Sequence, residues 1–518
     1  MSRFPIYKNN FLWSSRIGLA RRRVLAGVAC IALAGCAVGP DFKAPELPAA
    51  ARSGSYTATP LAGQTAASTG LAGAAQRFAS AQDIPAEWWK VFHSDPLDQL
   101  IRQALQQNPT LASAQAALRE AQENYNAEAG SLRYPNVGAQ LGATREHASE
   151  LTVGKPGGAV FNLYNASVNV GYTVDVFGAA RRTLEGARAA VEFQRYQLEA
   201  AYLALTANVV TTAIREASLR AQLQATRQVL DAQRQQLNLT ERQFSLGAIP
   251  RTAVLTQRSQ VAQTAATLPG LQKALAQARH QLAVYAGRLP SEGGLPEFTL
   301  DSLSLPHELP LTLPSTLARQ RPDVRASEAL LHEASAQVGV ATANQYPQFS
   351  LSASYGSSSL EAGNLFGGGT SIWSLAANLT APLFNGGALS AKRRAAVAAY
   401  DQAAAQYRTT LLTAFQNVAD SLRALEFDAD ALKAQTEVEL AARQSLQLTT
   451  DQYRLGAVSY LALLDAQRSY QQALIALVQA QAARYSDTAA LFQALGGGWW
   501  NRAAKPDTAL AADSGTTH

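Results

Sequence analysis

The sequence contains the same succession of patterns twice, and this duplication constrains the fold more than any other feature. Tyr134-Pro135 opens an alternating segment in the first half, and Tyr346-Pro347 opens a comparable one in the second. A long Ala/Gln/Arg-rich stretch follows each of them and is interrupted by a Leu-Gly-Ala turn, at Gly247 and again at Gly456. Equivalent positions are 207 to 212 residues apart. A repeated unit of short strands and very long helices predicts a symmetric assembly rather than a catalytic cleft.

The amino terminus predicts export and a lipid anchor. Arg21-Arg22-Arg23 precede an uncharged apolar stretch, 24–34, that is too short to span a membrane. Leu33-Ala34-Gly35-Cys36 follows and resembles the bacterial lipobox, in which the cysteine becomes the lipidated first residue of the mature protein. An ordinary secretion signal with an incidental cysteine is the alternative. Ala37 stands where an aspartate would signal retention at the inner membrane, which favours the outer membrane.

Cysteine and charge counts exclude two further classes of protein. Cys30 lies in the leader, so Cys36 is the only cysteine of the mature chain and no disulfide can form. The formal net charge is +6, but residues 1–35 hold six basic side chains and no acid, which leaves zero net charge after cleavage. The cationic surface that a nucleic-acid-binding protein needs is therefore confined to the leader.

The chain divides into segments by composition and period. A Pro/Ala/Gly/Ser/Thr-rich composition after Cys36 is typical of a linker or a strap laid over another surface. We expect a signal peptide at 1–35, a lipidated strap or linker at 36–83, a helical segment at 84–134, a β-hairpin at 135–178, a long helical hairpin at 179–289, a linker at 290–312, a helical segment at 313–346, a β-hairpin at 347–387, a long helical hairpin at 388–496 and a tail at 497–518.

The two hairpin segments change period from helix to strand. Apolar and polar residues alternate strictly over 166–175, and no charge occurs over 362–391. This pattern fits transmembrane β-strands of about 9–11 residues, apolar toward lipid and polar toward a lumen. A pair of hairpins in a soluble sandwich is the alternative that the same alternation permits.

Counting strands predicts an oligomer. Lipid tolerates no open sheet edge, and the smallest closed barrels have about eight strands. The chain offers four strands, so two copies would give eight and three would give twelve. Because only larger barrels leave an aqueous channel, three copies are favoured.

The long stretches predict helices of unusual length. Residues 179–245 contain no proline and one glycine, and 388–455 contain neither. At 1.5 Å per residue, each helix would extend for roughly 100 Å. Leu184, Val191, Leu198 and Leu205 recur every seven residues, which is typical of coiled-coil packing. Two antiparallel helical hairpins per chain would suit the wall of a long tube, and a plain coiled-coil spacer is the alternative.

Five short motifs stand in a fixed order along the two copies: Cys36-Ala37-Val38-Gly39-Pro40-Asp41-Phe42, Trp88-Trp89-Lys90-Val91-Phe92, Asp95-Pro96-Leu97, Tyr453-Arg454-Leu455-Gly456-Ala457 and Leu461-Ala462-Leu463-Leu464-Asp465-Ala466-Gln467-Arg468. Together they resemble the outer-membrane factors, the TolC/NodT-type lipoprotein efflux ducts. The resemblance extends from Cys36 to about Gly498. It implies a mixed α/β membrane protein: a trimeric, twelve-stranded transmembrane β-barrel with four strands per chain, continued by a long periplasmic α-helical barrel.

The resemblance also implies a function and partners. The protein would be the outer-membrane channel of a tripartite efflux system, a passive exit duct for drugs or other small molecules. Its expected partners are two further copies of itself, outer-membrane lipid, a periplasmic adaptor protein and an inner-membrane pump, commonly of the resistance-nodulation-division type. An exit duct of a type I protein secretion system remains the alternative, and a lipid-anchored coiled-coil scaffold without a pore is a second one.

Two places match functional positions of the family. The turns Ser245-Leu246-Gly247-Ala248 and Arg454-Leu455-Gly456-Ala457 match the periplasmic tips that meet the adaptor, and glycine supplies the backbone freedom for a helix reversal in any case. Asp465 matches an acidic position at the narrow end of the tunnel, where three copies would form an anionic ring. Some relatives carry a further acid where this chain has Ala462, so a second ring is not expected. A solvated surface aspartate is the alternative for Asp465.

No pattern in the sequence indicates catalysis. The six histidines have no close ligand spacing, and no mature cysteine other than Cys36 could join them in a metal site. The triple glycine 367–369 precedes a strand rather than a helix, which argues against a nucleotide cradle. We therefore expect no enzyme activity, no metal and no cofactor apart from the covalent lipid on Cys36.

Overall fold

The computed structural model describes residues 38–48, 55–80 and 82–502, which form two compact units. Unit 1 comprises the described residues up to 44 together with 119–192 and 329–405, and unit 2 comprises 45–118, 193–328 and 406–502. The predicted signal peptide, the lipidation site Cys36 and residues 503–518 of the predicted tail lie outside the described residues.

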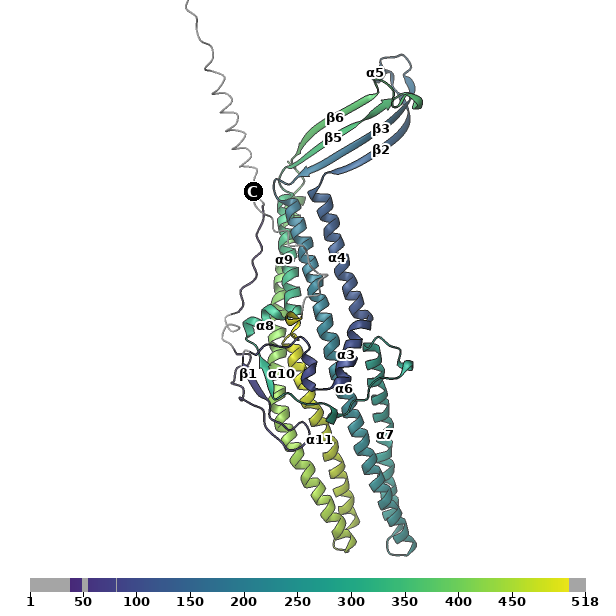
Figure 1. Cartoon of the computed structure of the whole chain (residues 1–518), viewed down its shortest axis with the longest axis vertical. Helices are drawn as coiled ribbons and strands as arrows, with labels where there is room; N and C mark the ends of the chain where they lie inside the picture. The colour runs from purple at the N-terminus through teal and green to yellow at the C-terminus, as the bar shows by residue number, and fades with distance from the viewer. Residues whose placement is uncertain (1–37, 49–54, 81, 503–518) are drawn as a thin grey trace, which may run out of the picture. The chain divides into compact units, whose positions relative to one another are not determined.

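Unit 1 is built around a four-stranded antiparallel sheet (Figure 1). The spatial order β2-β3-β5-β6 follows the chain, so each predicted hairpin is present and the two hairpins join through β3 and β5. The strands are β2 (Asn136–Ala148), β3 (Ala159–Val174), β5 (Gln348–Ser359) and β6 (Ser371–Thr380).

The lengths of the strands and the connections between them differ from expectation. The strands have 10 to 16 residues rather than 9–11. The reason is that β2 and β3 continue beyond the uncharged region: Arg145, Glu146 and His147 still pair with Asn162, Phe161 and Val160. The strand connections also contain single helical turns, α5 (Glu150–Val153) and η4 (Ala362–Asn364), where loops were expected.

Long helices account for most of the remaining chain. Four of them, α4, α6, α9 and α10, contribute residues to both units. The helices are η1 (Trp88–Phe92), α3 (Asp95–Gln107), α4 (Pro109–Arg133), α6 (Ala179–Ser245), α7 (Arg251–Tyr285), η2 (Pro290–Glu292), η3 (Leu300–Ser302), α8 (Pro314–Gln320), α9 (Pro322–Ala343), α10 (Ala388–Arg454), α11 (Tyr460–Ala494) and η5 (Trp499–Asn501).

The structure confirms the internal duplication. Helices α6 and α10 both have 67 residues, and α7 and α11 both have 35. The two longest helices of the second copy start 209 residues after their counterparts, since α6 begins at Ala179 and α10 at Ala388, and α7 begins at Arg251 and α11 at Tyr460. This shared offset lets each position of α7 be compared with its equivalent in α11.

The main hydrophobic core lies in unit 2. Its largest fully buried side chains include Trp88, Trp89, Phe92, Phe298 and Phe492. The ring of Trp88 stacks on Phe492 with the centroids 5.6 Å apart. The Trp-Trp-Lys-Val-Phe motif therefore packs against the last long helix, α11, and ties the beginning of the helical region to its end.

A short parallel strand pair in unit 2 was not expected from the sequence. Strand β1 (Arg77–Ser80) belongs to the strap, and its partner β4 (Glu308–Leu311) belongs to the linker between the two copies. Strands of four residues are too short to show a period, and these two are separated by 231 positions. The predicted strap thus contains a segment that is part of the folded unit.

Within residues 38–48, 55–80 and 82–502, no helix is both long and apolar enough to cross a membrane.

Candidate functional site

The sheet of unit 1 has one apolar and one polar face. Register partners continue across all four strands, so that Ala139, Val168, Tyr355 and Trp373 form one apolar row. The neighbouring row of Gly138, Asn169, Ser354 and Ser374 points to the opposite face, because successive residues of a strand alternate. The alternation seen in the sequence is therefore in register across the sheet.

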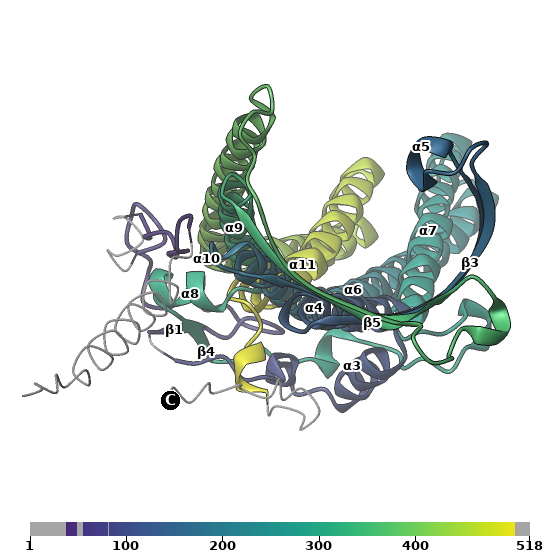
Figure 2. The ribbon, with the colours of Figure 1, turned by 90° about the horizontal axis from the view of Figure 1, so that it is seen from above.

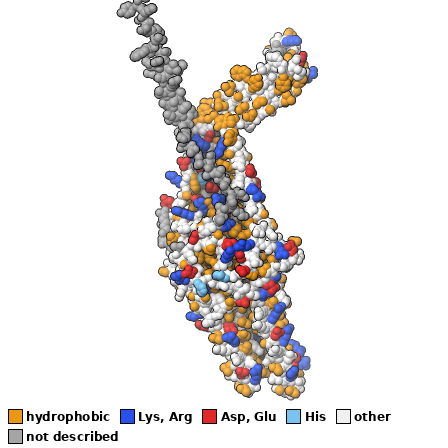
Figure 3. All heavy atoms as spheres, in the orientation of Figure 1, with side chains coloured by type: hydrophobic (Ala, Val, Ile, Leu, Met, Phe, Trp, Pro, Cys, Tyr) orange, Lys and Arg blue, Asp and Glu red, His pale blue; other side chains and the backbone are white. Residues whose placement is uncertain are grey.

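Large apolar side chains on this sheet are exposed in the single chain. Leu141, Trp373 and Leu375 are each about three-quarters exposed, and Figure 3 shows apolar side chains spread over the strands with charged ones gathered at the end that carries α5. Seen from above, the sheet is strongly curved (Figure 2). An exposed apolar surface of this extent marks an interaction site, and the absence of charge suits contact with lipid.

Both edges of this sheet are open. Strand β2 pairs with β3 alone and β6 pairs with β5 alone among the described strands. Open edges leave a row of backbone N–H and C=O groups unpaired, and a membrane cannot solvate them. The sheet of one chain is thus an incomplete element that needs strands from elsewhere.

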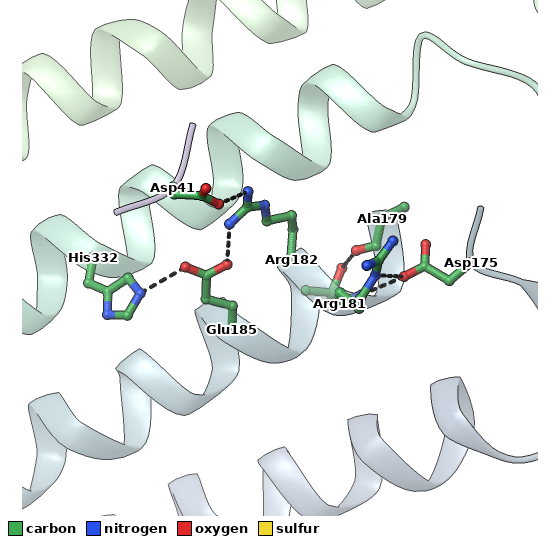
Figure 4. Close-up of polar contacts among 8 residues, drawn as sticks. Asp41, Asp175, Ala179, Arg181, Arg182, Glu185 and His332 are labelled. Atoms are coloured by element: carbon green, nitrogen blue, oxygen red, sulfur yellow. Dashed lines mark hydrogen bonds and ion pairs between the residues drawn. The ribbon is translucent and has the colours of Figure 1, made fainter. Parts of the chain in front are cut away.

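A polar cluster holds the segment that follows the lipidation motif (Figure 4). Asp41 Oδ1 lies 2.7 Å from Nη2 of Arg182, whose Nη1 lies 2.7 Å from Oε2 of Glu185. The second oxygen of Glu185 lies 2.9 Å from Nε2 of His332 on α9. Phe42 stacks on the His332 ring with the centroids 4.3 Å apart. This cluster, which we call the strap clamp, fixes residues 41 and 42 to α6 and α9.

The two predicted tips are helix reversals of identical construction. Gly247 and Gly456 have φ angles of +71° and +73°, in the left-handed region where glycine is favoured. Ala248 N–H donates to the Gln243 carbonyl at 2.9 Å, and Ala457 N–H donates to the Gln452 carbonyl at 2.9 Å. Together with the glycine N–H bonds, these contacts form Schellman motifs, which end α6 and α10.

Each tip presents one leucine to solvent. Leu246 is 83% exposed and Leu455 is 84% exposed. Neither reversal has an atom within 4 Å of the place where a Cβ on its glycine would lie, so the space beside it is open. A helix end of this kind requires the glycine but not the exposed leucine.

Asp465 lies in the second turn of α11 and is exposed. Its side chain is 73% exposed, and its Oδ1 lies 3.6 Å from Nη1 of Arg468, one helical turn away. The equivalent position of the first copy is Thr256, so the acid occurs in one copy alone. An ion pair this exposed adds little stability.

A group of buried charges in unit 2 was missed by sequence reasoning. Arg484 on α11 is fully buried and donates to Gln76 Oε1 at 2.8 Å and to the Leu425 carbonyl at 3.1 Å. One turn further, Asp487 faces Asp428 on α10; burial, followed by the contact with Asp428, raises the pKa of Asp487 to about 8. No sequence signal marks these residues, because charged side chains on Ala-rich helices are usually solvated.

No cluster of metal-ligating side chains was found in the part of the chain that the structure describes. What the site offers is a sheet with one polar and one apolar face, long helices, and exposed tips.

Comparison with known proteins places the chain in a family. The family described as "Outer membrane efflux protein" matches residues 100–288 and 313–497, which is once in each copy of the duplication and more than two thirds of the chain. The resemblance noted in the sequence is confirmed.

Individual relatives are similar over nearly their whole length. The chain is 30% identical over 483 residues to the antibiotic efflux pump outer membrane protein ArpC of Pseudomonas putida, covering 92% of this chain and 95% of ArpC. It is 30% identical over 419 residues to the probable outer membrane lipoprotein SilC of Salmonella typhimurium, covering 79% and 88%.

A solved structure shows the same fold. The outer-membrane channel OprN superposes with a TM-score of 0.80 at 28% identity and covers 90% of this chain and 100% of OprN. The expected combination of strands and long helices in duplicated halves is therefore confirmed. The chain belongs to the outer membrane efflux protein family, and it is the outer-membrane channel of an efflux system, extending into the periplasm, and not an enzyme.

Proposed function

We propose that three copies of the chain close one twelve-stranded barrel and act as a passive exit duct. The observation that carries this proposal is the sheet with two faces and two open edges, β2 and β6. Four strands cannot close a barrel, and about eight make the smallest one known in membranes. Three copies supply twelve strands, satisfy every edge and leave room for water inside, with the polar rows toward the lumen.

The duct receives its cargo from partners in the periplasm and inner membrane. The paired tips at Leu246 and Leu455 offer an exposed apolar side chain at the same place in each copy of the duplication. A periplasmic adaptor that binds both tips would meet six such sites around a trimer. The similarity to an antibiotic efflux pump protein supports drugs as cargo. A pump of the resistance-nodulation-division type is the partner that the family resemblance implies.

The mature chain is held to the membrane by a lipid on Cys36. The strap clamp begins at Asp41, five residues after that cysteine in the sequence. Similarity to a protein named as an outer membrane lipoprotein supports the same anchor here.

Drug susceptibility tests this function. The full chain is expressed with its adaptor and pump in a host that lacks its own outer-membrane ducts, beside an otherwise identical strain carrying the chain with Leu246→Asp and Leu455→Asp. We expect the native chain to restore resistance to several unrelated compounds and the tip variant to restore none. Trimers present in the membrane without any restored resistance would contradict drug efflux and favour the type I secretion duct.

A further inference from the structure

Three consecutive cations lie near the start of α10. Lys392, Arg393 and Arg394, which we call the basic triplet, are all exposed. None of the three forms an ion pair with any residue that the structure describes. The first turn of α10 contains no acidic residue, and the next acid along the helix is Asp401. Three adjacent positive charges close to the positive end of a helix repel one another and attract an anion.

The first copy of the duplication provides a comparison within the same chain. Its helix start also carries cations, but both are neutralised: Arg181 Nε lies 3.3 Å from Asp175, and Arg182 lies 2.7 Å from Asp41 and from Glu185. Both helix starts thus concentrate positive charge, and only the first supplies its own carboxylates. The second helix start has no described carboxylate paired with its cations, which leaves them available to an external anion.

The basic triplet lies at the boundary of the uncharged sheet. The chain carries no charge from residue 362 to residue 391, which includes all of β6, and Lys392 is the first charged residue after it. Strand β3 of the same sheet likewise meets its first charge at Asp175, one residue after its end. The triplet therefore marks the level at which the apolar surface of unit 1 ends on the side of the helices.

A cavity adjoins the triplet. It has a volume of about 400 Å³, and its lining includes Lys392, the polar side chains of Gln337, Asn344 and Gln348, and the apolar side chains of Val340 and Leu389. The mixture of hydrogen-bonding groups and apolar walls suits a ligand with a polar head and an apolar body. All of these residues belong to unit 1.

We propose that the basic triplet and the adjoining cavity bind the phosphate headgroup of an anionic phospholipid in the periplasmic leaflet of the outer membrane. Cations at the edge of an apolar membrane surface are attracted to anionic headgroups, and long Lys and Arg side chains can reach them from a helix. The inference rests on the proposed membrane insertion of the sheet. It adds a lipid-binding site that the channel function does not require.

Lipid titration of the purified full-length trimer tests the proposal. Native mass spectrometry of delipidated trimers measures binding of phosphatidylglycerol and of phosphatidylcholine with the same acyl chains. The variant carries Lys392→Gln, Arg393→Gln and Arg394→Gln. The matched control carries Arg251→Gln, Lys273→Gln and Lys433→Gln, which removes the same charge from exposed positions of unit 2.

We expect the native chain and the control to prefer phosphatidylglycerol, and the triplet variant to bind it about tenfold more weakly or worse. A second variant, Lys392→Arg with Arg393→Lys and Arg394→Lys, keeps the charge and should keep the preference. Gel electrophoresis of heated and unheated samples shows separately whether the trimer has formed. Loss of the trimer and loss of lipid binding can therefore be distinguished.

Three results would overturn the lipid assignment. Equal phosphatidylglycerol binding by the triplet variant and the control would remove these cations from any lipid site. Full competition by glycerol 3-phosphate, which has the headgroup phosphate but no acyl chains, would indicate a site for free phosphate. Loss of the trimer in the triplet variant alone would mean that the cations meet acids of a second copy, such as those on the exposed part of α4.

Discussion

Arg182 lies on the long helix α6 and forms an ion pair with Asp41 of the strap. Its side chain is only 7% exposed, whereas that of its partner Asp41 is 87% exposed, so the pair is half solvated. Such a pair contributes at most about 1 kcal/mol to the stability of the fold. The contact matters more for position than for stability, because it fixes the chain close to the expected lipid anchor.

Replacing Arg182 with methionine should release the strap while leaving the fold intact. Methionine keeps the apolar stem but cannot bind Asp41 or Glu185, so Lys43 beside the clamp should become more accessible to trypsin. We expect cleavage after Lys43 to become several-fold faster in the variant. Arg188→Met, an exposed arginine of the same helix, is the control. Equal cleavage rates in the two variants would show that the clamp does not hold the strap.

Substitution of Asp465 tests whether this residue forms part of a gate at the narrow end of the tunnel. In a trimer, three exposed aspartates at this level would form an anionic ring, and Asp465→Ala removes all three charges. We expect reduced cation preference and a changed single-channel conductance in planar bilayers, while Asp451→Ala, an exposed ion-paired acid of α10, should alter neither. Unchanged conductance and cation preference in Asp465→Ala would exclude this residue from the gate.

Asp487 introduces a pH dependence into the packing of α10 and α11. Because burial raises its folded pKa from 3.8 to about 8, the folded state prefers the protonated acid. Stability is therefore full below about pH 4, falls as the pH rises toward 8, and stays low above it. Asp487→Asn keeps a hydrogen-bonding side chain without a charge to bury.

Thermal unfolding in detergent tests whether the stability of the fold decreases as the pH rises. We expect Asp487→Asn to unfold at the same temperature as the native chain at pH 4, and several degrees higher at pH 9. Asp430→Asn, an exposed acid on α10, should show no such trend. A difference between the Asp487 variant and the native chain that does not grow with pH would contradict the raised pKa.

At the scale of elements, the long helices follow directly from the sequence. Helix α6 occupies the stretch without proline, and its end at Ser245 is set by Gly247, whose positive φ other residues adopt at a cost. The alternation of the strands likewise survives in the structure, because a one-residue shift would move every side chain to the wrong face. The periodicity of the sequence is enough to predict a helix or a strand where one pattern extends over many residues.

The contacts that sequence reasoning missed are short or join distant positions. Arg484 meets Gln76 across 408 residues, and β1 has four residues that pair with β4. A buried arginine looks like a solvated one in a sequence, and four residues show no period. The strap clamp was missed for the same reason, since Asp41 and Arg182 are 141 residues apart.

The helix reversals should tolerate polar substitution without loss of the fold. Leu246→Asp and Leu455→Asp replace side chains that are more than four-fifths exposed, so the stability of the chain should change by less than about 0.5 kcal/mol. Cross-linking to the adaptor in cells should nevertheless fall strongly, because an adaptor surface that buries leucine cannot bury a charge without cost.

Leu151→Asp is the matched control for the tips. This leucine is 99% exposed in α5, in the connection between β2 and β3 of unit 1. It should leave adaptor cross-linking unchanged. Equal cross-linking by the tip variant and the Leu151 variant would show that the exposed leucines are not the adaptor site.

At the scale of the whole molecule, the account depends on closure of the sheet by neighbouring copies. One chain provides two open edges, β2 and β6, and an apolar face that a single copy leaves exposed. The long helices that continue from these strands belong to the same chain, so the copy number of the barrel also fixes that of the helical part. The central claim is therefore that β6 of one copy pairs with β2 of the next.

Cysteine cross-linking in the outer membrane tests this claim most directly. Cys36 is the only cysteine beyond the predicted leader, so a cysteine at Ala139 on β2 can be combined with single cysteines at successive positions of β6. The account predicts that at least one combination yields a covalent trimer, and that either cysteine alone yields none. Covalent dimers without trimers, or no species larger than the monomer at any position of β6, would contradict it.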